Sequence, residues 1–419
     1  MHSSALLDLA GELLRTVLRF EQPADAVASS FFRQHRNLGP RERHALAETV
    51  YTVLRRRPLL QHLAQSGPGP LERRLVLLGW QGSEGLLSGA LTLPDTQWLE
   101  RARAVPLESL PDELRHNLPG WLAEALKSAL GDEQFWALTA SLDIAAPLDL
   151  RVNALRAERE EVRAALAAGG IETQPTPHSP WGLRVAGKPA ISKLDVFTRG
   201  DVEVQDEGSQ LLALLTESRR GEMVVDFCAG AGGKTLALGA MMRNTGRLYA
   251  FDVSGHRLDA LKPRLARSGL SNVYAVQIAH ERDDRIERLA GKIDRVLVDA
   301  PCSGLGTLRR NPDLKWRQSP RTIDALKAEQ TAILNSAAHL LKPGGRLVYA
   351  TCSLLESENE EIAQRFSSER REFVSLPAAP VLERAGLEGA TDLAPGDYLR
   401  LWPHRHATDG FFAAMWQRK

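Results

Sequence analysis

Cysteine is scarce in this sequence: its 419 residues include only Cys228, Cys302 and Cys352. An odd number of widely separated cysteines argues against a disulfide framework and favours a reducing compartment. There is no CxxC pair, so the spacing predicts no metal site. No apolar run approaches the roughly 18 residues of a membrane span, and Glu12 and Arg15 interrupt the apolar pattern that a signal peptide would need. We therefore expect a cytoplasmic protein.

Low-complexity tracts, internal repeats and a strong overall charge are also absent. The net charge is +1, and 43% apolar with 25% charged residues is typical of a globular protein. The length predicts roughly two to four domains. A nearly neutral total can still hide local patches. Between Arg33 and Arg57, seven arginines stand against two acids, which indicates either a solvated face or a patch that binds phosphates.

In the first half of the chain the apolar pattern changes once, from helical to strand-like. Apolar residues at spacings of three and four predict helices over residues 5–64, 71–91 and 118–142, with a break at Pro23. From Leu148 to about Val204, short strand-like segments surround one helical segment. We expect an all-α domain over residues 1–142 and a small α+β insert over residues 143–204.

From residue 205 to the end, strand and helix patterns alternate. The expected strands are 223–227, 247–251, 273–278, 293–298, 346–350, 372–375 and 411–416. The expected helices are 234–242, 254–268, 281–290, 322–341 and 357–366. This alternation is typical of an α/β fold with a doubly wound, Rossmann-like parallel sheet, here over residues 205–419.

The loop DFCAGAGGKT (226–235) follows the first expected strand of that sheet. Its glycines allow a tight turn close to a ligand, and the next helix offers free N–H groups. A Walker phosphate loop fails because Cys228 stands where its first glycine belongs. A dinucleotide GxGxxG motif is weak because Thr235 replaces the third glycine. A third possibility is S-adenosylmethionine, whose methionine part would lie over this loop.

A carboxylate follows the second expected strand. Asp252 lies twenty residues beyond Gly232, where it could accept hydrogen bonds from both hydroxyls of a ribose. Its alternative role is that of a helix N-terminal acid before Ser254. Ribose binding fits a nicotinamide dinucleotide as well as S-adenosylmethionine.

Two further strands end on reactive side chains. Asp299 and Cys302 follow the apolar run from Ile293, and Cys352 follows the run GRLVYA (345–350). Ligands bind at the carboxyl ends of such strands, although a single buried cysteine is usually a small apolar residue. Carbon 5 of a pyrimidine is a poor nucleophile until a thiolate adds to carbon 6 and makes an enamine. Two thiols and a carboxylic acid could supply the nucleophile, the proton acceptor and a group that holds the ring.

Three segments together resemble the Nop/Sun family of RNA 5-methylcytosine methyltransferases: DFCAGAGGKT, DAPCSGLGTLRRNPDLKW and YATCSLLESENE. The resemblance is strong over residues 200–417, including the closing DGFF at 409–412, and weaker before that. The order of domains is similar to that of the bacterial Sun, or RsmB-type, ribosomal RNA enzymes. The resemblance implies a class I methyltransferase domain over 205–419, a NusB-like RNA-binding domain over 1–142 and an RNA-binding insert over 143–204.

The resemblance also implies roles for individual residues. Cys352 would be the nucleophile on carbon 6, Cys302 would assist proton removal and enzyme release, and Asp299 would contact the cytosine edge near N3. The cofactor would be S-adenosyl-L-methionine, without a metal. Its expected binding residues are Cys228, Ala229, Gly230, Ala231, Gly232, Gly233, Lys234, Asp252, Glu281 and Asp299.

Two positions depart from the family pattern. Gly230 and Ala231 stand where the family usually has alanine and proline, which predicts a more flexible turn. After the third strand the family usually has an aspartate near the adenine, whereas this chain has His280 followed by Glu281. We transfer the adenine contact to Glu281. Lys234 has a second possible role as an ordinary helix-terminal residue.

We expect methylation of a cytosine in small-subunit (16S) rRNA, before or during subunit assembly, by a monomer that binds neither DNA nor membranes. A transfer RNA enzyme and a non-catalytic ribosome-assembly factor are the alternatives. The presence of Asp299, Cys302 and Cys352 argues against the non-catalytic assembly factor.

A basic loop follows Cys302 in the sequence. Its residues Arg309, Arg310, Trp316 and Arg317 either contact single-stranded RNA around an extruded base or are simply packed.

Overall fold

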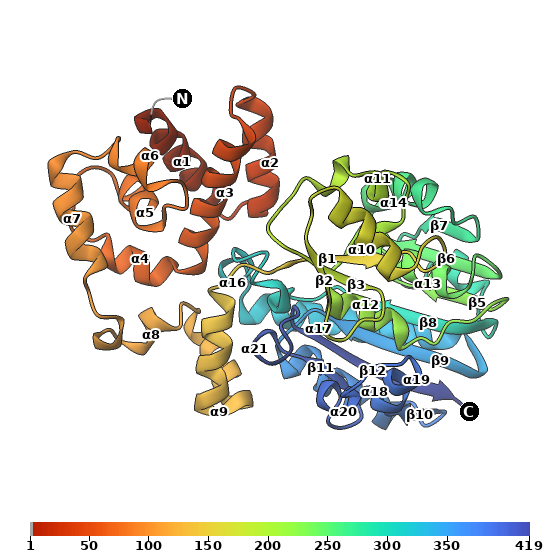
Figure 1. Cartoon of the computed structure of the whole chain (residues 1–419). Helices are drawn as coiled ribbons and strands as arrows, with labels where there is room; N and C mark the ends of the chain where they lie inside the picture. The colour runs from red at the N-terminus through yellow and green to blue at the C-terminus, as the bar shows by residue number, and fades with distance from the viewer. Residues whose placement is uncertain (1–2) are drawn as a thin grey trace. The chain divides into compact units, whose positions relative to one another are not determined.

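The computed structural model describes residues 3–419, and internal contacts divide the chain into two compact units (Figure 1). The first unit consists of the residues up to Ala145 together with Thr307–Pro320, and the second of Ala146–Gly306 and Arg321–Lys419. The segment Thr307–Pro320 therefore interrupts the second unit in sequence and folds with the N-terminal helices. The expected domain boundaries at 142/143 and 204/205 remain predictions.

The first unit is helical. Its α-helices are α1 (Ser3–Val17), α2 (Ala24–Gln34), α3 (Pro40–Arg55), α4 (Arg57–Leu63), α5 (Leu71–Gly79), α6 (Glu84–Ser88), α7 (Leu93–Arg103), α8 (Asp112–Arg115), α9 (Gly120–Leu142) and α16 (Leu314–Arg317). The predicted break at Pro23 is confirmed, because this residue stands directly before α2. Helices α1, α3 and α5 pack on one another through buried side chains such as Leu13, Val50 and Leu75. Among the helices of residues 3–419, none combines the length and the hydropathy that a membrane span requires.

A small antiparallel sheet begins the second unit. Its strands are β1 (Leu148–Val152), β2 (Thr173–Pro175), β3 (Gly182–Val185) and β4 (Val202–Val204), in the order β2-β3-β1-β4. Helices α10 (Arg159–Ala168) and α11 (Asp195–Thr198) accompany it. Leu150, Val162 and Leu183 join sheet and helix in one buried core. The expected arrangement of strands around a helix is confirmed.

An eight-stranded sheet forms the larger part of the second unit (Figure 1). Its strands are β5 (Met223–Asp226), β6 (Arg247–Asp252), β7 (Val273–Gln277), β8 (Ile293–Asp299), β9 (Leu341–Thr351), β10 (Phe373–Leu376), β11 (Leu399–Leu401) and β12 (Phe411–Arg418). Their order is β7-β6-β5-β8-β9-β12-β10, with β11 paired to β12. Because β5 is parallel to both β6 and β8, the winding direction reverses there. A crevice for ligands is expected at the strand ends beside such a reversal.

The α/β prediction is confirmed, with differences in detail. The helices are α12 (Glu207–Leu214), α13 (Gly233–Met241), α14 (Gly255–Ser268), α15 (Asp284–Glu287), α17 (Pro320–Leu340), α18 (Glu360–Glu369), α19 (Ala379–Arg384), α20 (Ala390–Leu393) and α21 (Pro403–His406). The expected helix at 281–290 is reduced to α15. Strands β5 to β9 are parallel, whereas β12 is antiparallel to β9, β10 and β11.

Both faces of the large sheet are buried. Along β9, Leu347 and Tyr349 join the core on one face, and Val348 and Ala350 join the core on the other. This alternation follows from the two-residue period of a strand. Since both faces are occupied by packing, the strand ends are where a site can form.

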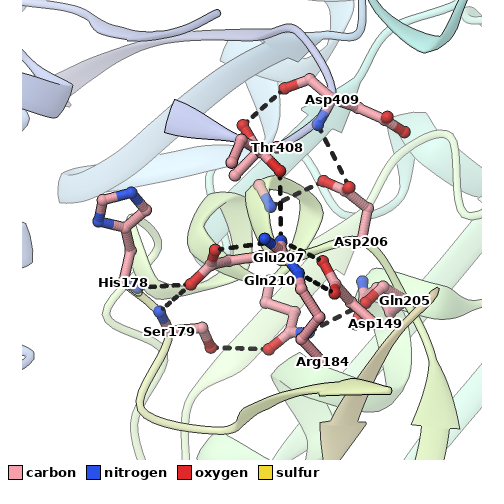
Figure 2. Close-up of polar contacts among 12 residues, drawn as sticks. Asp149, His178, Ser179, Arg184, Gln205, Asp206, Glu207, Gln210, Thr408 and Asp409 are labelled. Carbon is pink, nitrogen blue, oxygen red and sulfur yellow. Dashed lines mark hydrogen bonds and ion pairs between the residues drawn. The ribbon is translucent and has the colours of Figure 1, made fainter. Parts of the chain in front are cut away.

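Polar contacts tie the small sheet to α12 (Figure 2). The carboxylate of Glu207 is fully buried and accepts hydrogen bonds from the backbone N–H groups of His178 (2.5 Å) and Ser179 (2.7 Å). The hydroxyl of Ser179 donates to Gln210 Oε1 at 2.7 Å. These contacts fix the turn before β3 onto α12, the helix that precedes the large sheet.

Candidate active site

A cavity of about 750 Å³ opens at the carboxyl ends of the central strands of the large sheet. Its walls come from the loops after β5, β6, β7, β8 and β9. The lining includes Cys228, Ala229, Gly230, Ala231, Gly233, Lys234, Asp252, His280, Glu281, Asp299, Cys302 and Cys352. Of the site residues expected from the sequence, Gly232 is the one outside this lining. The fold thus brings together positions that are more than 120 residues apart in the chain.

The glycine turn between β5 and α13 requires glycine at position 232. Gly232 has φ +84° and stands directly before α13, and its N–H donates to the carbonyl of Ala229 at 2.8 Å. A Cβ atom at this position would lie 2.0 Å from the side chain of Leu261. A larger residue would therefore push the turn and helix α14 apart. Gly232 shapes the cavity floor without lining it.

Asp252 holds this turn against the second strand. Its Oδ2 accepts a hydrogen bond from the N–H of Gly230 at 2.8 Å, and its Oδ1 accepts one from the N–H of Ser254 at 2.7 Å. The second contact matches the alternative role as a helix N-terminal acid. Each carboxylate oxygen can accept more than one hydrogen bond, so the side chain retains capacity for ligand hydroxyls.

Lys234 and Asp299 form an ion pair inside the cavity. The Nζ atom of Lys234 lies 2.7 Å from Asp299 Oδ2, and the lysine side chain is 11% exposed. Burial disfavours the ammonium form, but the adjacent Asp299 carboxylate outweighs this effect and raises the pKa of Lys234. Lys234 is therefore a charged wall of the cavity rather than only a helix-terminal residue.

The sulfur atoms of Cys302 and Cys352 lie 3.4 Å apart, and both thiols are free. Cys302 follows β8 and Cys352 follows β9, which are neighbouring parallel strands, so their carboxyl ends meet at one edge. The hydrogen bond to Cys352, together with burial, raises the pKa of Cys302. Cys302 therefore retains its proton at neutral pH and can donate it toward the other sulfur.

Close backbone packing supports Cys352. The carbonyl of Cys352 accepts a hydrogen bond from Gly306 N–H, and the carbonyl of Gly306 accepts one from Gly410 N–H, both at 2.8 Å. A Cβ atom at Gly306 would lie 2.1 Å from the Gly410 carbonyl. The structure thus explains why Gly410, in the closing DGFF segment, is a glycine. It allows the loops that contain Gly306, Cys352 and Gly410 to pack closely together.

Two titratable groups, Asp226 and Cys228, line the cavity where β5 leads into the glycine turn. Burial raises the pKa of Asp226 to about 7, even though its Oδ2 accepts a hydrogen bond from Thr235 Oγ1 at 2.7 Å. Burial also raises the pKa of the Cys228 thiol. Cys228 therefore lines the cavity as a neutral thiol.

Sequence reasoning missed Arg264 of α14. It lines the cavity, donates to the carbonyl of Ala231 at 2.6 Å and pairs with Glu203 at 3.0 Å. Arg264 thereby anchors the outer side of the glycine turn. Nothing in the sequence distinguishes this arginine from other charged residues of an amphipathic helix.

The basic loop after the cysteine block is packed within the first unit. Trp316 Nε1 donates to the carbonyl of Leu54 at 2.8 Å, and Lys315 Nζ donates to the carbonyl of Arg55 at 2.7 Å. The two bonds satisfy carbonyl groups that the C-terminus of α3 leaves without intrahelical partners. Of the two alternatives for this loop, packing therefore holds for Trp316.

The arginine-rich stretch from Arg33 to Arg57 divides into two parts. Arg55 is buried, and Arg57 stacks over the rings of Phe20 and Trp316 at 5.1 and 5.3 Å. The earlier part lines a surface hollow of about 600 Å³ between α2 and α3. Its cationic and aromatic lining residues are Phe32, Arg33, Arg36, Arg43 and Tyr51. This earlier part, with Arg33 and Arg36 exposed, is open to a ligand.

Comparison with known proteins points to one family. Residues 213–417 match the family described as 16S rRNA methyltransferase RsmB/F, and residues 118–192 match the ferredoxin-like domain of RsmF/B-like methyltransferases. A probable ribosomal RNA small subunit methyltransferase B from Synechocystis sp. is 33% identical over 97% of this chain and 98% of its own length. The protein of the same name from Bacillus subtilis is 31% identical over 81% of this chain and 75% of its own.

Solved structures share the architecture. The crystal structure of PH0851 has a TM-score of 0.80 and 27% identity, covering 100% of this chain and 98% of that one. A methyltransferase homologue from Pyrococcus horikoshii has a TM-score of 0.62 and 28% identity, over 73% of this chain and 97% of that one. NSun6 from Pyrococcus horikoshii, solved with SFG, has a TM-score of 0.63 at 22% identity over 72% of this chain and 98% of that one, which shows the fold alone.

The cavity also suits the cofactor that the family uses. The turn at Gly230 and Gly233 leaves open space for a ligand against the backbone, since a Cβ atom there would meet no heavy atom within 3.5 Å. Asp252 offers further acceptor capacity on the same wall. Site, fold and likeness over nearly the whole length agree: the chain belongs to the RsmB/F family of 16S rRNA methyltransferases and is an S-adenosyl-L-methionine-dependent RNA methyltransferase.

Proposed function

We propose that this protein methylates carbon 5 of a cytosine in small-subunit (16S) rRNA through a covalent adduct between Cys352 and carbon 6. The observation that carries the proposal is the 3.4 Å separation of the Cys302 and Cys352 sulfur atoms in one cavity with the Lys234–Asp299 pair. A target base must leave its stack to reach such a recessed site. Unpaired or extruded cytosine is therefore the expected substrate.

The thiolate of Cys352 would add to carbon 6, and as the Sγ–C6 bond forms the electron pair of the C5–C6 double bond would shift toward C4 and N3, which leaves the ring as an anionic enamine. Carbon 5 of this enamine would then take the methyl group, which the cofactor supplies on a sulfonium centre. Cys302 would accept the proton of carbon 5 while it passes its own thiol proton to the departing sulfur of Cys352, 3.4 Å away. The electron pair of that C–H bond would restore the C5–C6 double bond as the Sγ–C6 bond breaks, which releases the enzyme.

Asp299 would orient the ring, because a carboxylate can accept a hydrogen bond from the exocyclic amine of cytosine next to N3. The Lys234 ammonium, 2.7 Å from Asp299 Oδ2, holds this carboxylate in place. S-adenosyl-L-methionine would lie on the turn from Cys228 to Lys234, with Asp252 accepting from its ribose and Glu281 near its adenine. In support of this placement, one cavity is lined by Cys228, Lys234, Asp252 and Glu281.

We also propose that residues 1–142 and the insert 143–204 bind RNA, whereas residues 205–419 carry the chemistry. The hollow that contains Arg33, Arg36 and Arg43 supports the first part of this proposal, because guanidinium groups and an aromatic ring suit phosphates and a stacked base. The relatives from Synechocystis sp. and Bacillus subtilis, whose names specify the ribosomal small subunit, support the choice of RNA.

The test is methylation of RNA stripped of protein. The purified enzyme, supplied with radiolabelled cofactor, should label 16S rRNA and not transfer RNA, and sequencing should map the label to carbon 5 of cytosine. Cys352→Ala should abolish labelling. Labelling of transfer RNA alone, or of an atom other than carbon 5, would overturn the proposal.

A further inference from the structure

Each of the two cysteines is followed by a serine that is turned away from the cavity. Cys302 and Cys352 line the cavity, whereas Ser303 and Ser353 are buried, with 1% and 0% of their surfaces exposed. The two serine hydroxyl oxygens lie 3.1 Å apart. The two cysteine loops therefore contact each other twice: through their sulfur atoms at the cavity and through their serine hydroxyl groups in the protein interior.

The carboxyl group of Glu358 binds both serine hydroxyl groups. The Glu358 Oε2 atom accepts hydrogen bonds from the hydroxyls of both Ser303 and Ser353, and Oε1 accepts one from the backbone N–H of Ser303 at 2.9 Å. Gln330 Nε2 donates to Oε1 at 3.0 Å and to the carbonyl of Pro301 at 3.0 Å. Both oxygens are thus occupied by donors from the residues around the two cysteines.

Glu358 itself is held firmly. It is 0% exposed, and its backbone carbonyl accepts a hydrogen bond from Tyr349 OH at 2.6 Å. The next residue, Asn359, donates to the carbonyl of Ser353 at 3.1 Å and bonds to the hydroxyl of Thr351. A buried carboxyl group costs free energy when it loses its hydrogen-bond partners. Movement of either cysteine loop would break these hydrogen bonds, so the network restricts the two loops to one conformation.

The reaction does not use this group directly, because the cavity lining does not include Glu358. We propose that Glu358 is a positioning residue that sets the separation and orientation of the Cys302 and Cys352 sulfur atoms. This inference rests on the proposed function, in which both thiols act on one ring. A displacement of about 1 Å at a reacting group can cost about 100-fold in rate, so a rigid support of this kind has a catalytic consequence.

The carboxylate of Glu358 also acts electrostatically on the Cys302 thiol. Along with the hydrogen bond to Cys352 and burial, it contributes to the raised pKa of Cys302. Loss of the carboxyl group should therefore change both the geometry and the proton affinity of the pair. A residue with a purely structural role elsewhere in the unit would alter neither.

The test compares Glu358→Gln with Glu207→Gln, a matched variant. Glu207 is also a fully buried carboxylate of the second unit that accepts two backbone hydrogen bonds, but its partners are His178 and Ser179 (Figure 2). The first measurement needs no RNA: diamide oxidises neighbouring thiols to a disulfide, and peptide mass spectrometry gives the rate of Cys302–Cys352 crosslinking. We expect the wild type and Glu207→Gln to crosslink alike and Glu358→Gln at least about 10-fold more slowly.

The second measurement is single-turnover methylation. Glu358→Gln should lower the rate of methyl transfer about 100-fold and leave the Kd for the cofactor within about twofold of the wild-type value. If a folded Glu358→Gln protein crosslinks and methylates at the wild-type rate, the proposal is overturned. If the wild type crosslinks as expected but methylates no RNA, the proposed function fails while the crosslinking comparison still decides the role of Glu358.

Should Glu358→Gln fail to fold, Ser303→Ala and Ser353→Ala decide the matter, because each removes a single hydroxyl. Each should slow crosslinking and methyl transfer by roughly 5-fold, and the double variant should be slower by less than the product of the two effects. Wild-type rates in both single variants would contradict the proposal.

Discussion

The Nζ atom of Lys234 and the Oδ2 atom of Asp299 lie 2.7 Å apart, although one residue lies in the first turn of α13 and the other ends β8, 65 residues later. Lys234→Met removes the cation and leaves the Asp299 carboxyl group without its ion-pair partner. Because Asp299 then loses the contact that fixes its orientation, we expect single-turnover methyl transfer to fall about 100-fold. Lys262→Met is the control, since Lys262 and Asp259 form an exposed pair at the same 2.7 Å distance. Equal activity in the two variants would remove Lys234 from the site.

Replacement of Gly232 by alanine should destabilise the protein and weaken cofactor binding. The left-handed backbone costs about 1–2 kcal/mol for a residue with a Cβ atom, and the 2.0 Å approach to Leu261 adds a steric cost. Gly221→Ala separates the two contributions, because Gly221 has φ +81° but open space around it. Urea unfolding should show the larger loss for Gly232→Ala. Calorimetric titration should show weaker cofactor binding in that variant alone.

The buried Asp226 predicts a pH dependence of stability. Its pKa is raised to about 7 in the folded protein, so between about pH 4 and pH 7 the folded state binds more protons than the unfolded state. This group therefore lowers stability as the pH rises through that window. Neighbouring Asp299, Lys234 and Asp252 also act on it electrostatically.

Asp226→Asn should remove that dependence. The difference in unfolding free energy between the variant and the wild type should shift in favour of the variant from pH 5 to pH 8, by a few kcal/mol at most. Denaturant unfolding of both proteins at the two pH values measures this shift, and contributions from other titrating groups cancel in the difference. A constant difference would mean that Asp226 is ionised in the folded state throughout this range.

The surface hollow of the helical unit should contribute to RNA affinity. The double charge reversal Arg33→Glu with Arg36→Glu should weaken binding of 16S rRNA fragments about 10-fold or more and reduce the salt dependence of the Kd. The control reverses Arg101 and Arg103, two exposed arginines at the end of α7 in the same unit. Filter binding over a range of salt concentrations measures both effects. Equal losses in the two variants would indicate general electrostatic attraction and no specific hollow.

The sequence was sufficient to predict which site residues lie at the ends of strands. Short apolar runs stop at Asp299 and at Thr351, so the placement of Cys302 and Cys352 at neighbouring strand ends followed from local pattern and parallel topology. Strand β11 escaped prediction because Leu399–Leu401 is only three residues long. Its pairing with β12 depends on contacts that no local pattern carries.

The remaining features depend on distant contacts. Trp316 follows the cysteine block in sequence, but its partner is the carbonyl of Leu54, 262 residues earlier. Glu358 falls in a segment whose pattern predicts a helix from residue 357, whereas α18 begins at Glu360 and Glu358 ends a 3₁₀ turn. A charged residue at a helix start is ordinarily solvated. Only the fold shows that this one is buried between the two cysteine loops.

The most direct test of the account is covalent trapping on RNA. Cys302→Ala, incubated with 16S rRNA and S-adenosyl-L-methionine, should accumulate a protein–RNA adduct that survives denaturing electrophoresis, because Cys352 can still attack carbon 6 while release is impaired. Cys352→Ala should form no adduct under the same conditions. An adduct with Cys352→Ala and none with Cys302→Ala would reverse the roles of the two thiols, and no adduct with either would contradict the covalent mechanism.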